Sequence, residues 1–263
     1  MKPRIALICH HDDRFDRDLV SRWITSFAEL VGIVEIEERR GMRWRRLRAE
    51  GRRVGIPRLL DVLAFRLYYR FAFAAADAAW ERAAIARAQQ AWKTPDPATP
   101  VLRTHDPNDD KVRSFLQRVA PDLTIARCKW LLKRTVYCVP RLGTFVLHPG
   151  ICPQYRNAHG CFWALASDDP GNVGMTLLAI DDGIDTGPVY GYYRYPQDAL
   201  RESHVRIQHR VFLENADAIR DRLLEISAGR ASPVPVATLM SRNWGQPWLS
   251  AYLHYRRKPR QSA

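Results

Sequence analysis

Two residues far apart in the chain, His148 and Asp185, are of the types that together move protons in enzymes. His148 ends an apolar run at residues 143–148, and Asp185 stands 37 residues later in an Asp-rich turn. A carboxylate beside an imidazole fixes the tautomer of the ring and favours its charged form. If the two apolar runs are neighbouring strands, the side chains can meet and act as a proton shuttle. For His148 taken alone, a purely structural histidine is the alternative.

Polar side chains follow three apolar runs of the sequence, at residues 10–13, 148–150 and 181–185. Ligands bind at the carboxyl ends of strands in open parallel sheets, so these clusters are the places where a site is expected. His10, His11 and Asp12 are predicted to contact substrate, with a solvated turn as the alternative. Consecutive residues point in different directions, so no metal site is predicted there. The patterns of a dinucleotide fingerprint, a P-loop and a hydrolase nucleophile elbow do not occur in the sequence.

The elements that must position these residues follow from hydrophobic periodicity. Apolar runs predict strands at 2–9, 31–37, 122–126, 143–148, 173–181 and 189–195. Helical spacing predicts helices over 16–30, 57–92, 110–119 and 203–228, with Gly32 ending the first. Strands alternate with helices over the first 150 residues, which predicts an α/β fold with a mostly parallel sheet.

The positive charge of the chain is concentrated in one segment. The net charge is +13, and residues 39–53 hold eight arginines and one glutamate. Such a chain favours an acidic partner: a phosphate-bearing small molecule, nucleic acid or an anionic membrane surface. An apolar helix follows at 59–80, which could lie on a membrane surface. Packing against the core or against a second copy in a homodimer is the preferred interpretation.

Cysteine usage and the absence of long apolar runs indicate a cytoplasmic protein. The five cysteines include no C-x-x-C pair, so buried thiols are expected rather than a disulfide framework or a zinc site. No apolar run approaches the ~18 residues of a membrane-spanning helix. We expect a catalytic domain over 1–200 with a helical Arg-rich insert at about 39–92, and a C-terminal helix and extension over 201–263 packed on it.

Residues 139–190 resemble the core of the folate-dependent formyltransferases, which include methionyl-tRNA formyltransferase, glycinamide ribonucleotide transformylase and the sugar N-formyltransferases. The positions in register with the family pattern are Gly143, His148, Pro149, Pro153, Tyr155, Arg156, Gly174, Thr176, Asp181, Gly183, Asp185, Gly187 and Pro188. The resemblance implies a Rossmann-like formyltransferase fold, in which a twisted, mostly parallel sheet is flanked by helices. It also implies 10-formyltetrahydrofolate as co-substrate and a primary amine as acceptor.

Formyl transfer of this kind needs a proton acceptor, a proton donor and a stabiliser of the oxyanion. The family supplies these from an Asn, a His and an Asp. His148 and Asp185 match the last two, but Val146 stands where the Asn belongs, and Gly150 replaces the usual Ser. Asn157 or His159 could supply the missing donor. Otherwise the chemistry differs or formyl transfer has been lost.

The resemblance also points to binding residues and to the class of acceptor. It implies a folate pocket from Trp130, Leu131, Leu132, Asp181 and Asp182, and substrate contacts from Tyr155 and Arg156. The turn after the first strand lacks a Gly-rich phosphate cradle, and too few residues follow the last predicted helix for a tRNA-binding barrel. We therefore expect a small, anionic or sugar-type amine rather than tRNA. The alternatives are a formyl hydrolase or other one-carbon enzyme, and a non-catalytic binding protein.

Overall fold

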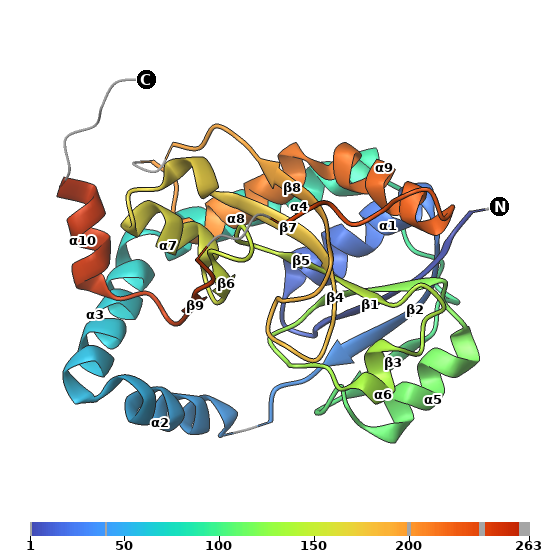
Figure 1. The fold of residues 1–263 in the computed structure, drawn as a ribbon, viewed down its shortest axis with the longest axis horizontal. Coiled ribbons are helices and arrows are strands. Elements are labelled where there is room, and N and C mark those ends of the chain that lie inside the picture. The colour runs from blue at the N-terminus through green and yellow to red at the C-terminus, as the bar shows by residue number, and fades with distance from the viewer. Residues whose placement is uncertain (1, 40, 199–200, 237–239, 258–263) are drawn as a thin grey trace.

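A seven-stranded sheet in the order β3-β2-β1-β4-β5-β7-β8 forms the centre of the computed structural model (Figure 1). The model describes residues 2–39, 41–198, 201–236 and 240–257. The first five strands in this order are parallel to one another, and β7 runs antiparallel to both of its neighbours, β5 and β8. The prediction of a mostly parallel α/β sheet is therefore confirmed. The strands are β1 (Arg4–His10), β2 (Glu29–Ile36), β3 (Val101–Thr104), β4 (Leu123–Arg127), β5 (Thr144–His148), β7 (Gly174–Ala179) and β8 (Val189–Arg194).

Helices cover both faces of the sheet, which explains why its central strands are apolar throughout. In β1, Leu7 packs into the core on one face and Ile8 into the core on the other. The helices on the Leu7 face are η1 (Phe15–Val20, π-helical), α1 (Ser21–Phe27), α4 (Ala74–Ala91), α7 (Gly160–Ala166), α8 (His204–Glu214) and α9 (Ala216–Ser227). The helices on the Ile8 face are α5 (Asp110–Val119) and the short α6 (Arg134–Tyr137).

Three local expectations differ from the structure. The first helix ends at Phe27, and Gly32 lies inside β2, so the prediction that Gly32 ends the helix is wrong. The absence of a side chain at Gly32 instead leaves room for α5, since a Cβ there would lie 2.9 Å from the Phe115 ring. The predicted helices over 57–92 and 203–228 are each broken, at Phe73 and at Asn215. The edge strand β3 is not among the predicted strands.

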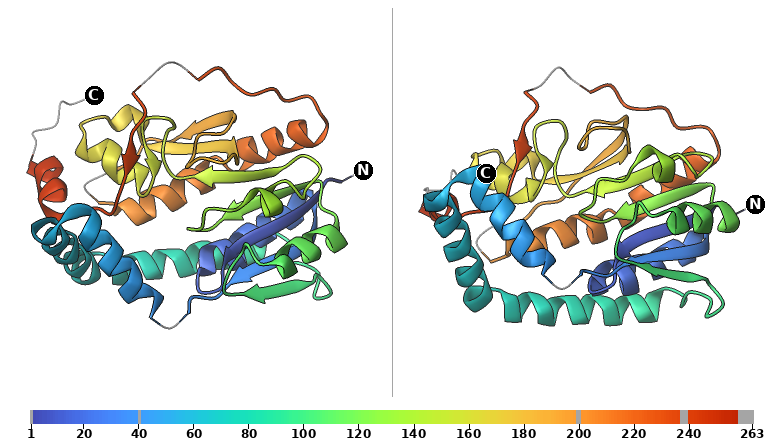
Figure 2. Two further views of the ribbon diagram at one scale, coloured as in Figure 1. Left: turned by 60° about the horizontal axis from the view of Figure 1, so that its bottom comes forward. Right: turned by 90° about the horizontal axis from the view of Figure 1, so that it is seen from below.

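The basic insert folds into an arm of two helices, α2 (Met42–Val54) and α3 (Ile56–Ala72), which we call the arm (residues 42–72). The two helices meet at Gly55, whose φ of +79° is one that glycine adopts without strain. The arm stands at one end of the molecule and contacts α10 (Leu249–Arg257) (Figures 1 and 2). Asp61 accepts a hydrogen bond from the Ser250 amide at 3.0 Å, and Arg58 stacks over the Trp248 ring at 4.1 Å.

A second, two-stranded sheet ties the C-terminal segment to the loop that follows β5. In it, β6 (Arg156–Asn157) pairs in parallel with β9 (Asn243–Trp244). The segment that contacts the arm therefore also contacts the loop beside His148. Within the described residues, no helix is long and apolar enough to cross a membrane.

Candidate active site

His148 is the last residue of β5 and is almost fully enclosed by protein. Along β5, Phe145 and Leu147 point into the main core, so Val146 and His148 share the opposite face. His148 is 3% exposed; its Nε2 lies 2.8 Å from the carbonyl oxygen of Tyr155, and its Nδ1 lies 3.4 Å from Oδ2 of Asp185. A carbonyl can only accept a hydrogen bond, so this contact assigns a hydrogen to Nε2. The atom that can gain or lose a proton is then Nδ1, which faces the carboxylate.

Asp185 reaches His148 because the turn that follows β7 is braced by its own hydrogen bonds. Asp181 Oδ1 accepts from the Gly183 amide at 2.9 Å and from the Thr186 hydroxyl at 2.7 Å. Arg156 donates to the carbonyl of Ile184 at 2.9 Å. Asp185 itself has a φ of +51° and accepts the backbone N–H of Asn157 at 2.7 Å through Oδ2. The same carboxylate oxygen therefore faces both His148 and the chain of β6.

Two glycines allow the loop at residues 149–160, which we call the His148 loop, to close over the imidazole. A Cβ on Gly150 would lie 2.4 Å from the Tyr155 carbonyl oxygen and 2.9 Å from Nε2 of His148. A Cβ on Gly160 would lie 2.5 Å from Cα of Gly150. No side chain fits at either position without moving backbone. This packing explains why Gly150 stands where the family pattern has Ser.

The two residues predicted as replacement donors lie in different surroundings. Asn157 Nδ2 donates to the carbonyl of Trp244 at 2.6 Å, so its amide is already engaged. His159 packs its ring against His204 at 5.3 Å, and burial lowers its pKa to about 4, helped by the charges of Lys129 and Arg66. Its Nδ1 is buried and has no hydrogen-bond partner among the described residues. Val146 lies half-buried in a small apolar cluster.

Tyr155 contributes its backbone, rather than its side chain, to the surroundings of His148. Its ring is 5% exposed and stacks on Trp244 at 5.9 Å. Its hydroxyl donates to Asp169 at 2.8 Å, and burial raises its pKa. The side chain is therefore part of the core, and only the carbonyl oxygen reaches His148.

His10, His11 and Asp12 form a separate group at the ends of β1 and β2. His10 accepts the backbone N–H of Lys129 through Nε2 at 3.1 Å, and burial lowers its pKa. His11 Nδ1 lies 2.6 Å from Glu35, and Asp12 is exposed. No hydrogen bond or ion pair of the described residues joins this group to His148 or Asp185.

The residues predicted to form the folate pocket are spread from the core to the surface. Leu132 is 3% exposed and belongs to the core beneath α5, whereas Leu131 is 57% exposed. Trp130 is half-buried against that core, as is Ile180 next to the Asp-rich turn. Asp182 accepts the Tyr137 hydroxyl at 2.6 Å. Trp130 and Ile180 therefore supply an apolar surface, and Leu132 stands behind it.

A buried ion pair that the sequence analysis did not identify supports the end of β5. Arg127 donates through Nε to Asp16 at 2.8 Å and through Nη1 to the carbonyl of Leu147 at 2.9 Å. Burial raises the pKa of Asp16 to about 7, although the charge of Arg127 opposes the shift. The sequence signal was an arginine directly after the predicted strand 122–126, a position that a parallel sheet encloses.

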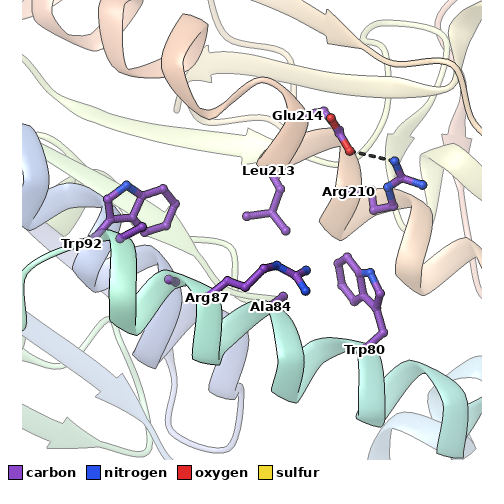
Figure 3. Close-up of a pocket in the computed structure, with 9 residues that line it drawn as sticks. Trp80, Ala84, Arg87, Trp92, Arg210, Leu213 and Glu214 are labelled. Atoms are coloured by element: carbon purple, nitrogen blue, oxygen red, sulfur yellow. Dashed lines mark hydrogen bonds and ion pairs between the residues drawn. The ribbon is translucent and has the colours of Figure 1, made fainter.

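A hollow of about 400 Å³ lies apart from these residues, between α4 and α8 (Figure 3). Trp80 and Trp92 stand on either side of it with Arg87 between them. Arg210, on the facing helix, is already paired with Glu214 at 2.7 Å and with Glu202 at 2.6 Å. Nothing that lines this hollow takes part in the contacts around His148. Within the described residues, no group of three or more His, Cys, Asp and Glu side chains could hold a metal ion.

The chain is similar to known proteins in both sequence and fold. Over 172 residues it is 30% identical to a methionyl-tRNA formyltransferase of Bacteroides fragilis, covering 60% of this chain and 53% of that protein, so the chain spans about half the length of this relative. A sugar N-formyltransferase of Shewanella has the same fold, with a TM-score of 0.52, 11% identity and coverage of 89% of this chain and 74% of that one. Glycinamide ribonucleotide transformylase 1 of Symbiobacterium toebii gives a TM-score of 0.53 at 13% identity, covering 87% and 89%. Residues 75–223 match the family model described as formyl transferase, which is more than half of the chain. The chain belongs to the formyltransferase family.

Proposed function

We propose that this protein transfers the formyl group of 10-formyltetrahydrofolate to the primary amine of a small acceptor, and that His148 and Asp185 move the proton. The observation that carries the proposal is the 3.4 Å approach of His148 Nδ1 to Asp185 Oδ2 in a chain of the formyltransferase family. His148 ends β5 and Asp185 lies in the turn after β7, and the two residues are held by separate hydrogen bonds. Such an arrangement is suited to a preorganised acid–base pair.

The residues near His148 are compatible with a bound folate and acceptor. When bound, 10-formyltetrahydrofolate would supply the electrophilic formyl carbon. Trp130 and Leu131 would hold its flat ring, together with the turn that contains Asp181 and Asp182. Three buried polar atoms of the His148 loop lack a hydrogen-bond partner among the described residues: Gln154 Oε1, Arg156 Nε and His159 Nδ1. Buried polar atoms are normally paired, so a polar ligand beside this loop would satisfy them.

The exposure of the pair suggests how a proton would travel. His148 is enclosed, whereas the Asp185 side chain is 15% exposed. Oδ2 of Asp185 faces His148, which leaves Oδ1 to meet the amine. In the proposed route, Asp185 accepts the proton of the attacking amine and His148 holds it at Nδ1. The pair then returns this proton to the nitrogen of tetrahydrofolate, which leaves as its bond to the formyl carbon breaks. The hydrogen bond from Nε2 to Tyr155 keeps the ring oriented while this occurs.

Because Val146 replaces the Asn of the family pattern, the donor that stabilises the oxyanion is proposed to come from the His148 loop. Val146 packs with Leu178, Val189 and Tyr192, so its surroundings are apolar. The Asn157 amide is engaged by Trp244, whereas His159 Nδ1 is unpartnered. We therefore assign the donor role to His159 in preference to Asn157.

The acceptor is proposed to be small and anionic. The net charge of +13 attracts anions, and Arg156 offers an unpartnered Nε beside Asp185. The amines on which the relatives act include tRNA-borne and sugar-borne ones, as their names state. Direct competition between a panel of amino sugars, amino acid derivatives and initiator tRNA would identify the class.

A turnover assay tests the proposal. Purified protein with 10-formyltetrahydrofolate should release tetrahydrofolate only when an amine is present. Replacing His148→Gln or Asp185→Asn should lower kcat/KM by about 10²–10⁴-fold, because the proton would then have no relay. The matched controls are His105→Gln and Asp110→Asn, an exposed histidine and an exposed aspartate away from the site, and both should keep wild-type rates. Folate release without an amine would instead indicate a hydrolase, and the absence of folate binding by calorimetry would contradict both activities.

A further inference from the structure

The outer face of α3 carries a stripe of exposed apolar side chains. The exposed fractions are 73% for Ile56, 60% for Leu60, 57% for Leu67 and 80% for Phe71. Their spacings of four, seven and four residues place them on one face of the helix. The opposite face is the packed one, since Phe65 is 3% exposed and contacts Phe162 and Tyr252. We call the exposed set the apolar stripe.

The neighbouring helix of the arm carries a cationic face. Arg45, Arg48 and Arg52 are exposed and three or four residues apart, so they lie along one side of α2. None of these three forms an ion pair with a carboxylate of the described residues. Trp44 is 68% exposed beside them, and an open hollow is lined by Gly41, Trp44, Arg45 and Arg48. By sequence, residues 42–72 contain nine arginines and only two acidic residues.

We propose that the arm binds the surface of an anionic lipid membrane, with the apolar stripe entering the headgroup region and the α2 arginines contacting lipid phosphates. Helices with a basic side and an apolar side containing Trp, Phe and Leu lie in the membrane interface in this way. Each arginine near an anionic leaflet adds attraction that salt weakens. The helices are not of the spanning type, so the arm lies on the bilayer and does not cross it.

The charge of the arm argues against a second copy of the chain, and its apolar stripe argues against nucleic acid. A second copy of the chain would bring two strongly positive arms together, and like charges across an interface are unfavourable. Nucleic acid would neutralise the arginines but would leave Ile56, Leu60 and Leu67 in water, because phosphates and ribose do not cover aliphatic side chains. A lipid surface offers both an anionic layer and an apolar layer. The proposal does not depend on formyl transfer, so the two can fail separately.

The arm is connected to the His148 loop through the C-terminal segment that runs from β9 to α10. The arm occupies one end of the structure in both views of Figure 2 and packs on the segment that runs from β9 to α10. That segment pairs with β6 of the His148 loop. Residues 42–72 also lie outside residues 75–223, the part that matches the family model. The arm is therefore an addition to the matched domain that reaches the edge of its candidate site.

Vesicle co-sedimentation of the full chain tests the proposal. The protein should sediment with vesicles of phosphatidylcholine containing phosphatidylglycerol, and not with pure phosphatidylcholine. Raising the salt from ~0.1 M to ~1 M should release most of it. The variant Leu67→Ser/Phe71→Ser should bind at least about tenfold more weakly, since two apolar side chains no longer leave water. The variant Arg45→Gln/Arg48→Gln/Arg52→Gln should lose about 100-fold.

Matched variants and two further measurements decide the outcome. Leu131→Ser removes an exposed apolar side chain elsewhere, and Arg82→Gln/Lys93→Gln/Lys133→Gln removes three exposed charges elsewhere. Both should bind vesicles like the wild type. Equal losses in these controls would overturn the proposal, as would no binding to anionic vesicles. A dimer in light scattering that Leu67→Ser/Phe71→Ser converts to monomer would assign the stripe to a second copy, and tight RNA binding without vesicle binding would assign the arginines to nucleic acid. Unchanged circular dichroism and thermal melting confirm that each variant is folded.

Discussion

The His148 loop and the arm differ in how far their side chains are engaged by other groups of the protein. Around His148, both ring nitrogens, the carboxylate of Asp185 and the backbone of Asn157 are engaged by other protein groups. Glycine at positions 150 and 160 brings backbone to backbone so closely that no Cβ fits. On the arm, large apolar side chains such as Phe71 face solvent, and Arg45, Arg48 and Arg52 of α2 have no carboxylate partners among the described residues.

This difference separates two kinds of site. A site that moves protons needs its groups held in place before the ligand arrives, because misplacement of a catalytic group by an ångström is costly in rate. A docking surface needs its groups available, because their partners are outside the chain. The engagement of His148 and Asp185 by other protein groups thus indicates positioning, whereas the unpaired charges of Arg45, Arg48 and Arg52 and the exposed apolar groups on the arm indicate an external partner.

The largest expected effect on folding stability comes from the close approach of the two glycines. Gly160→Ala should destabilise the fold by about 3 kcal/mol, because its new methyl group meets backbone atoms of Gly150 and Pro149 that cannot rotate away. Tyr155 should move from His148 with the displaced loop. Urea unfolding measures the loss. The matched control is Gly171→Ala, where nothing lies within 4 Å of the added Cβ. Equal stability of the two variants would mean that the loop does not pack as closely as described.

The second effect is a dependence of stability on pH that comes from His159. Burial lowers the pKa of His159 to about 4 in the folded chain, against an ordinary value of 6.5. Between these values the unfolded chain binds the extra proton, so the contribution of His159 is intact above pH 6.5 and is lost as the pH falls towards 4. From pH 7 to pH 5, the wild type should lose about 2 kcal/mol relative to His159→Asn, since Asn does not titrate and tolerates the positive φ.

Urea unfolding of both proteins at the two pH values measures this difference. His209 offers an independent test of the same sign, because burial also lowers its pKa to about 4. Asp16 acts in the opposite direction, since its raised pKa makes the folded state more stable as the pH falls. For this reason the comparison is between wild type and variant at each pH. Parallel curves for wild type and His159→Asn would show that His159 is accessible to water in the folded protein.

Features that depend on the types of side chains along the chain could be predicted from the sequence, whereas features that depend on where the backbone lies could not. The alternating strands and helices carry a periodic apolar pattern, and the mostly parallel sheet predicted from it is confirmed. The pairing of His148 with Asp185 could be anticipated, since both are polar residues that follow apolar runs and both match the family pattern. Their roles in the reaction stay a prediction.

Other features have no local signal in the sequence. The carbonyl of Tyr155 is a backbone group, so no residue type reports that it reaches His148. The Asp16–Arg127 pair joins residues 111 positions apart, and only the folded sheet brings them together. The edge strand β3 has four residues, of which Val101 and Arg103 are exposed, so it lacks the apolar run by which strands are identified. The apolar helix of the arm is apolar on several faces, so periodicity could not distinguish the packed face from the exposed one.

The smallest expected effect is on the free energy of unfolding of variants in the apolar stripe, and it tests whether the stripe belongs to the core. Phe71→Ala and Leu60→Ala should each change the free energy of unfolding by less than about 0.5 kcal/mol, because the side chains they shorten already lie in water. A stability measurement by urea unfolding, made on the same samples as the vesicle assay, is the check. If either variant costs more than about 1 kcal/mol, its side chain packs against part of this chain, and the apolar stripe is then a piece of the core and not a docking surface. If the free energy of unfolding is unchanged while vesicle binding falls, the exposed face of α3 contributes to membrane association and not to folding. This is the behaviour expected of a docking surface.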